Sequence, residues 1–461
     1  MPQVETGRGQ VGGQVDSAAV GAGDEVGLAD SLRSWVEAQL RPEGYSLPLI
    51  KRISLVVAGL LRAESAERGK LILAIDGLKV SAAQPESVAR RLVRTLDDPR
   101  LDPERVLPSC LKAQLAVLLA EVLAEHARSA SDPQHVLRFP LLRIVVDEST
   151  KLADVHILVA GLSYQGIVIP LAIRVWKQNQ ALPAEEYRAH LASLLASVEE
   201  VLPPVLRQHV LLLADRAYGR PDFLDLLEAL NWHYVVRIQG QTRILCSDGS
   251  DGSDEVSLAA RTFAPDKGSV WCSGDSPESW PRAIAAFKGA GWRACQFVAA
   301  WAPEADEPWL LVTNLKATSE RFLDYASRWA IERTFLSWKS HGWDIEALKM
   351  TSPLRLGRLL VGIALATLWT LAAGVAHTTT LIEERLAKRR EPRRAARQLH
   401  LPFAGADRRP FVAKFSLLTW GRNVFHSHPC QTSTPPIRWT LPHWHAPVWS
   451  VHAQQLLATN P

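Results

Sequence analysis

The feature of this 461-residue chain that most limits its fold is a series of short apolar runs in its middle part. The runs near residues 142–147, 155–163 and 167–175 are rich in Val, Ile and Leu and have the length of buried strands. An amphipathic helical pattern follows over 184–202, and the next apolar run ends on Asp215. This order predicts a β-meander followed by βαβ units around one central sheet.

The chain leaves that pattern before its last core helix. A second helix over 221–230 and a strand over 233–239 are predicted first. Residues 240–318 then open with the loop sequence CSDGSDGSDEVS and continue with strand-like pieces around 296–302 and 308–315. We therefore expect a β-rich insertion in the core.

Acidic residues stand where two of the predicted strands end. Asp147 ends the run LLRIVVD, and Asp215 ends the run HVLLLAD. A third acid, Glu332, lies in the helical segment DYASRWAIERTFLSWKS. Three carboxylates suit Mg²⁺ or Mn²⁺, and a pair of such ions serves in-line phosphoryl transfer.

Four side chains of the helical segment share one narrow stripe. Tyr325, Arg328, Glu332 and Lys339 are offset by 0, 3, 7 and 14 residues. At about 100° per residue they point to roughly 0°, 300°, 340° and 320°. A metal-binding acid beside cations that grip a phosphate backbone fits this stripe. A solvated helix with ordinary ion pairs would carry the same charges, but the two strand-end aspartates favour the catalytic interpretation.

These features resemble the DDE transposases of the insertion sequence 4 family. That family is recognised by a Tyr, two residues, Arg, three residues, Glu, six residues and Lys, which Tyr325, Arg328, Glu332 and Lys339 reproduce without a gap. The resemblance covers about residues 140–350. It implies an α/β ribonuclease-H-like catalytic core with a β-rich insertion, between an all-helical N-terminal domain and a helical C-terminal region.

The resemblance also implies an activity. A transposase binds the terminal inverted repeats of its insertion sequence, cleaves the DNA ends and joins the 3′ hydroxyls to target DNA by two-metal-ion phosphoryl transfer. The catalytic and metal-binding residues would be Asp147, Asp215 and Glu332, which would hold two Mg²⁺ ions, with Mn²⁺ as a substitute. The DNA-binding residues would be Tyr325, Arg328 and Lys339. Family members act as dimers, so a homodimer is expected on DNA.

Some family members form a hairpin at the DNA end, which requires an unstacked base to be held against an aromatic ring. Trp271, Trp301 and Trp309 lie in the insertion and are candidates for that ring. For any one of them, packing in the core is the favoured interpretation.

The N-terminal third divides into two parts. Residues 1–30 are rich in Gly, Val and Asp, with no continuous apolar pattern, and are expected to be disordered. Residues 31–139 carry several helical patterns, and the resemblance implies a DNA-binding domain there. Arg90, Arg91 and Arg94 are candidates for backbone contacts, although a basic helix face is also an ordinary soluble surface.

The C-terminal region is expected to contain helices over 351–398 and a Pro-, His- and Trp-rich tail over 399–461 without a predicted structure. A basic segment in the helical part is either a charged linker or a DNA contact. Its cations are Arg385, Lys388, Arg389, Arg390, Arg393, Arg394 and Arg397. The apolar run 359–375 is at the lower length limit of a membrane span, but a helix buried against the sheet explains it better, so no membrane partner is expected.

Charge and cysteine content agree with a DNA-acting protein of the bacterial cytoplasm, associated with the nucleoid when on DNA. The net charge is only +4, so DNA affinity must come from local basic patches. The five cysteines form no CxxC pair, which favours a reducing compartment. Two rival functions remain: a catalytically inactive ribonuclease-H-like DNA-binding protein, and a nuclease that cuts DNA without joining it.

Overall fold

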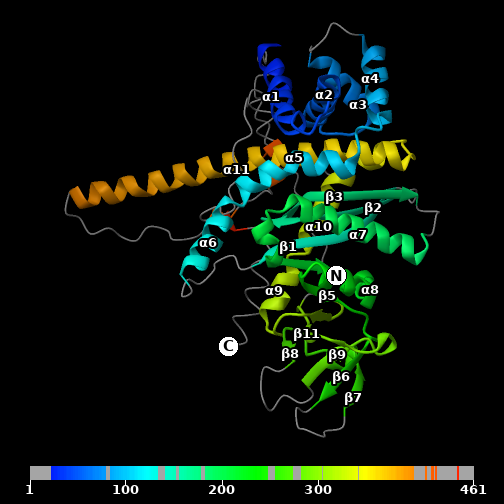
Figure 1. Cartoon of the computed structure of the whole chain (residues 1–461). Coiled ribbons are helices and arrows are strands. Elements are labelled where there is room, and N and C mark those ends of the chain that lie inside the picture. Colours follow the sequence, from blue (N-terminus) through cyan, green and yellow to red (C-terminus); the bar gives the residue numbers. More distant parts are fainter. Residues whose placement is uncertain are drawn as a thin grey trace, which may run out of the picture.

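The computed structural model describes residues 22–78, 84–132, 141–151, 155–177, 182–247, 255–273, 282–303, 305–340, 342–398, 411–412, 417–419, 421–422 and 444–445. The first four helices of the chain lie on one side of a long helix, and a mixed sheet lies on the other (Figure 1). The N-terminal helices are α1 (Ala22–Leu40), α2 (Leu47–Ala63), α3 (Arg68–Gly77), α4 (Pro85–Asp97), α5 (Pro103–Leu118) and α6 (Ala120–Ser131).

Two expectations for this helical part need correction. Helix α1 begins at Ala22, so residues 22–30 are helical, whereas residues 1–21 lie outside the described residues. Leu28 and Ala29 are buried, and packing of α1 against α2 stabilises a helix that composition alone did not indicate. Residues 111–127 carry one continuous helical pattern in the sequence, but they are divided between α5 and α6, which are bent by 59°.

The main sheet has eight strands in the order β3-β2-β1-β4-β5-β12-β11-β8. Strands β1, β2 and β3 form the expected antiparallel meander, and β1, β4 and β5 are parallel to one another. These five strands are β1 (Leu142–Lys151), β2 (Val155–Tyr164), β3 (Ile167–Lys177), β4 (Val210–Ala214) and β5 (His233–Arg237). The connecting helices are α7 (Ala184–Val201) and α8 (Pro221–Ala229). The arrangement is consistent with the ribonuclease-H-like order expected from the sequence.

The insertion continues the main sheet rather than forming one separate β unit. Its strand β12 (Trp309–Thr313) pairs antiparallel with β5, and β11 (Gln296–Ala300) and β8 (Val270–Cys272) follow outward. This pairing covers the edge that β5 would otherwise expose. A second sheet has the order β10-β9-β6-β7, with β6 (Arg243–Ser247), β7 (Val256–Ala259), β9 (Arg282–Ala286) and β10 (Arg293–Ala294).

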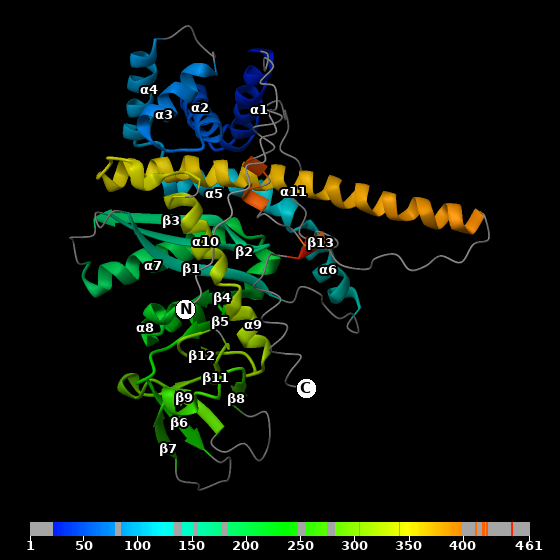
Figure 2. The same cartoon turned by 180° about the vertical axis from the view of Figure 1, so that it is seen from behind.

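Two short helices, α9 (Glu320–Ala326) and α10 (Trp329–Lys339), lead to α11 (Pro353–Gln398). Helix α11 crosses between helices α1 to α4 and the sheet and then extends beyond the body of the protein (Figures 1 and 2). It packs against β3, α2, α5 and α4. The side chains of the basic segment lie outside the described residues, although the backbone there is helical.

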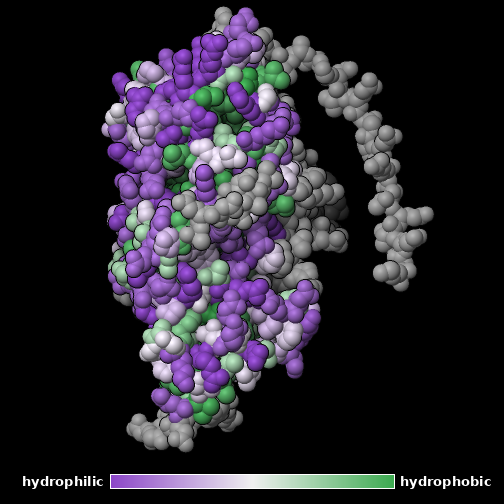
Figure 3. All heavy atoms as spheres, turned by 90° about the vertical axis from the view of Figure 1, so that its right-hand side faces the viewer, coloured by the Kyte–Doolittle hydropathy of each residue, from purple (hydrophilic) through white to green (hydrophobic). Residues whose placement is uncertain are grey.

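Within the described residues, the part of α11 over Pro353–Leu381 is long and apolar enough to cross a membrane, and the bent pair α5 and α6 would count as a second candidate if taken as one span. The apolar window of α11 is 94% buried inside the protein, as expected for a core helix. On the face shown in Figure 3, hydrophobic residues lie in small groups among hydrophilic ones.

Part of the C-terminal tail packs on α11. A Cβ atom on Gly374 would lie 2.0 Å from the carbonyl oxygen of Leu417, and one on Gly421 would lie 1.7 Å from that of Thr370. Only glycine permits so close an approach of the two backbones. The remaining described tail elements are strands β13 (Phe411–Val412) and β14 (Trp444–His445), which pair with each other.

Candidate active site

The two predicted aspartates lie side by side at one end of the sheet. In the parallel pair β1 and β4, Val146 is opposite Ala214, so Asp147 and Asp215 are the next residues in register. Asp147 still belongs to β1, whereas Asp215 follows β4 and its side chain accepts a hydrogen bond from the backbone N–H of Arg216 at 2.6 Å. The parallel pairing of β1 and β4 thus places Asp147 and Asp215 next to each other.

The signature side chains reach these carboxylates. Arg328 Nη1 donates to Asp147 Oδ2 at 3.0 Å, and its Nη2 donates to Glu332 Oε1 at 2.5 Å. The Tyr325 hydroxyl donates to Asp215 Oδ1 at 3.3 Å. Arg328 is only 6% exposed, so its guanidinium joins two of the three acids from a buried position.

The continuous helix expected over the signature is wrong, because α9 ends at Ala326 and α10 begins at Trp329. At the junction, Arg328 N–H donates to Tyr325 O at 2.9 Å and Ile331 N–H donates to Arg328 O at 3.0 Å. Such i to i+3 bonds tighten the turn to about three residues. Tyr325 and Arg328 therefore lie more nearly above one another than an α-helix would place them.

Lys339 is the signature residue that the structure does not bring to the carboxylates. It lies seven residues after Glu332, which is roughly 10 Å along a helix. Its ammonium is 3.9 Å from Glu346 Oε1, in the segment that follows α10. Lys339 thus extends the charged face of α10 away from the acids.

Hydrogen bonds to the sheet fix α9 and α10. The Thr334 hydroxyl of α10 accepts a bond from the backbone N–H of Val168 in β3 at 2.9 Å. Arg143 of β1 donates through Nε and Nη2 to Asp324 Oδ1 of α9, at 2.9 and 2.8 Å. Tyr325 and Glu332 are consequently carried by elements tied to the same sheet as Asp147.

A buried lysine holds the segment between α10 and α11. Lys151, at the end of β1, is 1% exposed, and its ammonium donates to Leu348 O at 2.7 Å and Met350 O at 3.0 Å. The Trp343 indole N–H donates to the Thr367 hydroxyl of α11 at 3.1 Å. The strand that carries Asp147 is therefore also tied to the segment that leads from α10 into α11.

Burial and charge set the protonation of the site. Burial raises the pKa of Asp147 to about 6, against the opposing effects of Arg328 and the backbone N–H of Glu148. Burial also raises the pKa of Tyr325, which stays a neutral donor to Asp215. Burial would lower the pKa of Arg328, but Tyr325 and the three acids outweigh it and raise that pKa.

The donor set fits a hard divalent cation in its chemistry, because all three predicted ligands are carboxylates. As they stand, however, no three His, Cys, Asp or Glu side chains in the described ranges are grouped closely enough to hold a metal ion. Between Asp147 and Glu332 the guanidinium of Arg328 supplies the positive charge instead. A metal ion that took Asp147 Oδ2 and Glu332 Oε1 as ligands would therefore displace Arg328 from these two oxygens.

Three charged residues beside Asp215 were missed in the sequence. Arg237 Nη1 lies 4.0 Å from Asp215 Oδ1, and its Nη2 lies 2.6 Å from Glu307 Oε1. Arg216 Nη1 lies 3.1 Å from the same Glu307 oxygen. The position of Arg216 directly after Asp215 and that of Arg237 at a strand end were available signals, but nothing in the sequence indicated Glu307.

Glu148, the acid next to Asp147, faces the other way along β1, as strand alternation predicts. Its Oε2 accepts a hydrogen bond from the Tyr187 hydroxyl of α7 at 3.2 Å, and its Oε1 contacts His156. It is therefore separate from the acids that Arg328 joins.

Of the three tryptophans in the insertion, Trp309 is the one whose ring packs against a signature residue. Its ring centroid is 5.0 Å from that of Tyr325, at an interplanar angle of 73°. Trp271 packs against Phe263 in the insertion, with centroids 4.9 Å apart. The indole N–H of Trp301 donates to Ala305 O at 3.0 Å.

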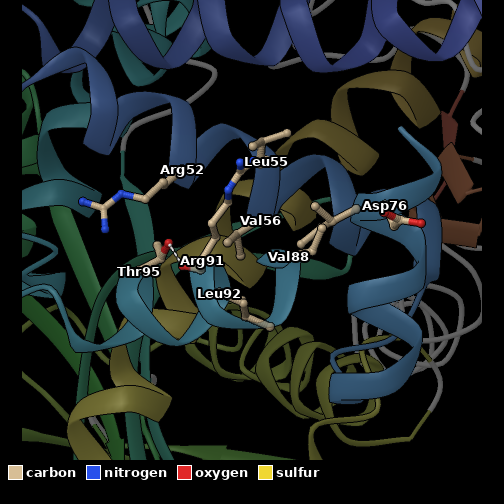
Figure 4. A pocket seen from close by; sticks show the side chains of 9 residues that line it. Arg52, Leu55, Val56, Asp76, Val88, Arg91, Leu92 and Thr95 are labelled. Carbon is tan, nitrogen blue, oxygen red and sulfur yellow. Dashed lines mark hydrogen bonds between the residues drawn. The ribbon is translucent and has the colours of Figure 1, made fainter. Parts of the chain in front are cut away.

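The N-terminal helices present a second basic region. Arg90, Arg91 and Arg94 are exposed on α4. Figure 4 shows Arg91 and Arg52 beside an apolar floor. The floor consists of Leu55, Val56, Val88 and Leu92. A neighbouring hollow of about 440 Å³ shares Arg52 and Arg91 and is also lined by Arg33 and Lys51.

Comparison with known proteins agrees with the geometry of the site. Residues 187–369 match the family model described as "Transposase DDE domain". The matched range begins in α7 and ends in α11, so it contains Asp215, Glu332 and the whole signature, while Asp147 precedes it. A search of curated proteins found no match. The family match supports a DDE transposase.

Proposed function

We propose that this protein is a transposase of the insertion sequence 4 type, with a ribonuclease-H-like catalytic core. It would bind the terminal inverted repeats of its element, cleave the DNA ends and join the 3′ hydroxyls to target DNA. The observation that carries this proposal is a set of hydrogen bonds from the signature residues to the three acids: Arg328 donates to Asp147 and Glu332, and Tyr325 donates to Asp215. The family match over residues 187–369 supports it.

Asp147, Asp215 and Glu332 would hold two Mg²⁺ ions, or Mn²⁺ in their place. When bound, such ions lower the pKa of water and balance charge on the scissile phosphate. The protein's own part is to carry the carboxylates on a sheet and on a helix that is tied to that sheet.

Tyr325, Arg328 and Lys339 would hold the DNA backbone beside the scissile bond. The buried Nε of Arg328 supports this role, because it has no hydrogen-bond partner among the described residues. Its N–H group could therefore donate to a phosphate oxygen without giving up a bond within the protein. A guanidinium offers phosphate a planar pair of donors, and the ammonium of Lys339 offers a point charge farther along α10. Trp309, which contacts Tyr325, is our choice for a ring that receives an unstacked end base.

The N-terminal helices would recognise the terminal repeats. Their exposed arginines Arg90, Arg91 and Arg94, with Arg52 and Lys51 nearby, suit contacts with backbone phosphates. We further propose that the protein acts in the bacterial cytoplasm and is a homodimer when bound to DNA, as expected for an enzyme that processes two element ends.

The test uses purified protein, Mg²⁺ and a DNA fragment with the inverted repeats that flank its gene. Nicking and joining are followed on a denaturing gel. Glu332→Gln should lower both by more than about a hundredfold, because a ligand charge is lost. The control, Glu320→Gln, removes an exposed acid of α9 and should act like the wild type.

The rival functions give different results in the same assay. Cutting without joining identifies a nuclease, and binding without cutting in every variant identifies an inactive DNA-binding protein. Either result contradicts the proposed transposase.

A further inference from the structure

Two arginines near the ends of neighbouring strands converge on one carboxylate beside the candidate active site. Arg216 lies two residues after the end of β4, and Arg237 is the last residue of β5. Both contact Glu307 Oε1, Arg237 Nη2 at 2.6 Å and Arg216 Nη1 at 3.1 Å. Arg237 Nη2 also donates to the carbonyl oxygen of Pro308 at 3.3 Å.

The carboxylate comes from far away in the sequence. Glu307 lies in the hairpin between β11 and β12, and β12 pairs with β5, so Arg237 is opposite Leu311. This pairing brings the hairpin over the end of β5 that faces Asp215. The insertion thus places one acid of its own on the two arginines of the core.

Burial differs between the partners. The Arg237 side chain is 12% exposed, whereas those of Arg216 and Glu307 are 46% and 52% exposed. An ion pair with an exposed partner is weak, because water and salt screen it and its side chains lose freedom. The carboxylate can therefore leave while Arg237 keeps its position.

Charge indicates what would replace it. Two guanidinium groups face a single carboxylate, and the nearest other acid, Asp215, is 4.0 Å from Arg237. The non-bridging oxygens of a phosphodiester carry the same charge as Glu307 and accept from guanidinium donors with the same geometry. A DNA strand whose phosphate is processed at Asp215 must carry neighbouring phosphates past this point.

We propose that Arg216 and Arg237 form a phosphate-binding site for the DNA strand, and that Glu307 occupies this site until a DNA phosphodiester displaces its carboxylate. This inference rests on the proposed function and adds a role for the insertion. The insertion competes with DNA through one side chain, so weak or incorrectly placed strands do not displace it.

The test measures DNA affinity rather than cleavage. A fluorescein-labelled duplex with the flanking inverted repeat is titrated with full-length protein in Ca²⁺, over a series of salt concentrations. Glu307→Gln should tighten binding about two- to fivefold, because an exposed ion pair no longer competes. Arg216→Gln should weaken it roughly tenfold and lower the salt dependence by about one phosphate contact.

Asp306→Asn is the matched control, since Asp306 is exposed in the same hairpin and its loss changes the net charge equally. It should leave the affinity within about a factor of 1.5, because long-range charge is screened. In a chain that also carries Arg216→Gln and Arg237→Gln, Glu307→Gln should no longer tighten binding, since the site itself is gone.

The outcomes separate this inference from the proposed function. If the wild type binds and cuts the repeat DNA while Glu307→Gln and Asp306→Asn have equal affinities, the phosphate site is refuted and the transposase is not. The same holds if Glu307→Gln tightens binding equally in the doubly substituted chain. A wild type that neither binds nor cuts this DNA refutes both.

Discussion

Replacing Arg328 by Gln should raise the affinity of the protein for divalent cations and at the same time lower DNA cleavage. In the structure the guanidinium donates to Asp147 at 3.0 Å and to Glu332 at 2.5 Å. A cation can take Asp147 Oδ2 and Glu332 Oε1 as ligands only after both hydrogen bonds are broken. The native arginine is therefore a competitor of the metal for two of its three proposed ligands.

The magnitude follows from the bonds that must be broken. A hydrogen bond between charged groups contributes about 1.5–3 kcal/mol. When a cation displaces Arg328 in the wild type, we take the free energy of one of its two hydrogen bonds as lost and that of the other as regained in a new contact of Arg328. Arg328→Gln has no such loss, so it should bind the cation about ten- to a hundredfold more tightly. The substitution also leaves the buried Asp147 without its cation, so in metal-free buffer the protein should lose about 3 kcal/mol of stability. Added Mn²⁺ should restore that stability more fully than it stabilises the wild type.

Calorimetric titration with Mn²⁺ or Ca²⁺ at pH 8, without DNA, measures the affinity, and thermal unfolding with and without the ion measures the restored stability. Lys339→Gln is the control, because it removes a positive charge from α10 whose ammonium contacts Glu346 and not the three acids. Equal cation affinities for the wild type, Arg328→Gln and Lys339→Gln would refute competition by Arg328. A gain of the same size in both variants would show that only the net charge matters.

Two further predictions concern β1. Because the pKa of Asp147 is raised to about 6 in the folded protein, cation affinity should fall about tenfold per pH unit below pH 6 and be level above it, as titration across pH 5–8 would show. The folded state binds this proton more tightly than the unfolded chain, so stability should decrease, by up to about 3 kcal/mol, as pH rises from about 4 to 6. Above pH 6 the contribution of Asp147 to stability no longer changes with pH. Unfolding free energies measured without metal across this pH range should show the decrease in the wild type and not in Asp147→Asn. A wild type without the decrease, or an Asp147→Asn variant that keeps it, contradicts the raised pKa of Asp147. Lys151→Met should lower the free energy of unfolding by about 2–4 kcal/mol, since the buried carbonyl oxygen of Leu348 and the partly buried one of Met350 lose their donor. Lys151→Arg should lose less in the same denaturant titration.

The strands of the core were predictable because they are short and almost wholly buried. The run that ends at Asp215 became β4, and the runs near 155–163 and 167–175 became β2 and β3 within two residues of their predicted ends. Strand β1 is longer than predicted and ends at Lys151, because its polar half pairs with β2 although it lacks an apolar pattern. Local hydrophobicity therefore located the sheet but did not set the length of every strand.

The details of the site could not be predicted from local patterns. A helical wheel assumes a uniform turn, so it did not show the tightened junction between Tyr325 and Arg328. It also placed Lys339 on the same stripe without the distance along the axis that separates it from Glu332. Glu307 depends on the pairing of β12 with β5, which is a contact between segments far apart in the chain.

The charges of Arg328 and Glu307, which occupy the two proposed ligand positions, would allow one site to accept ligands of opposite sign. Arg328, a cation, lies where Asp147 and Glu332 would receive metal ions, and Glu307, an anion, lies where Arg216 and Arg237 would receive a phosphate. Buried or partly buried charges of one sign repel each other strongly when left uncompensated, so each of these two side chains stabilises the folded site before the ligand arrives. When Arg328 leaves the acids it becomes available to DNA, and when Glu307 leaves the arginines they become available as well. Metal binding and DNA binding should therefore promote one another. Repeat DNA should raise the cation affinity of the wild type by more than it raises that of Arg328→Gln, because in that variant no arginine has to be displaced from Asp147 and Glu332.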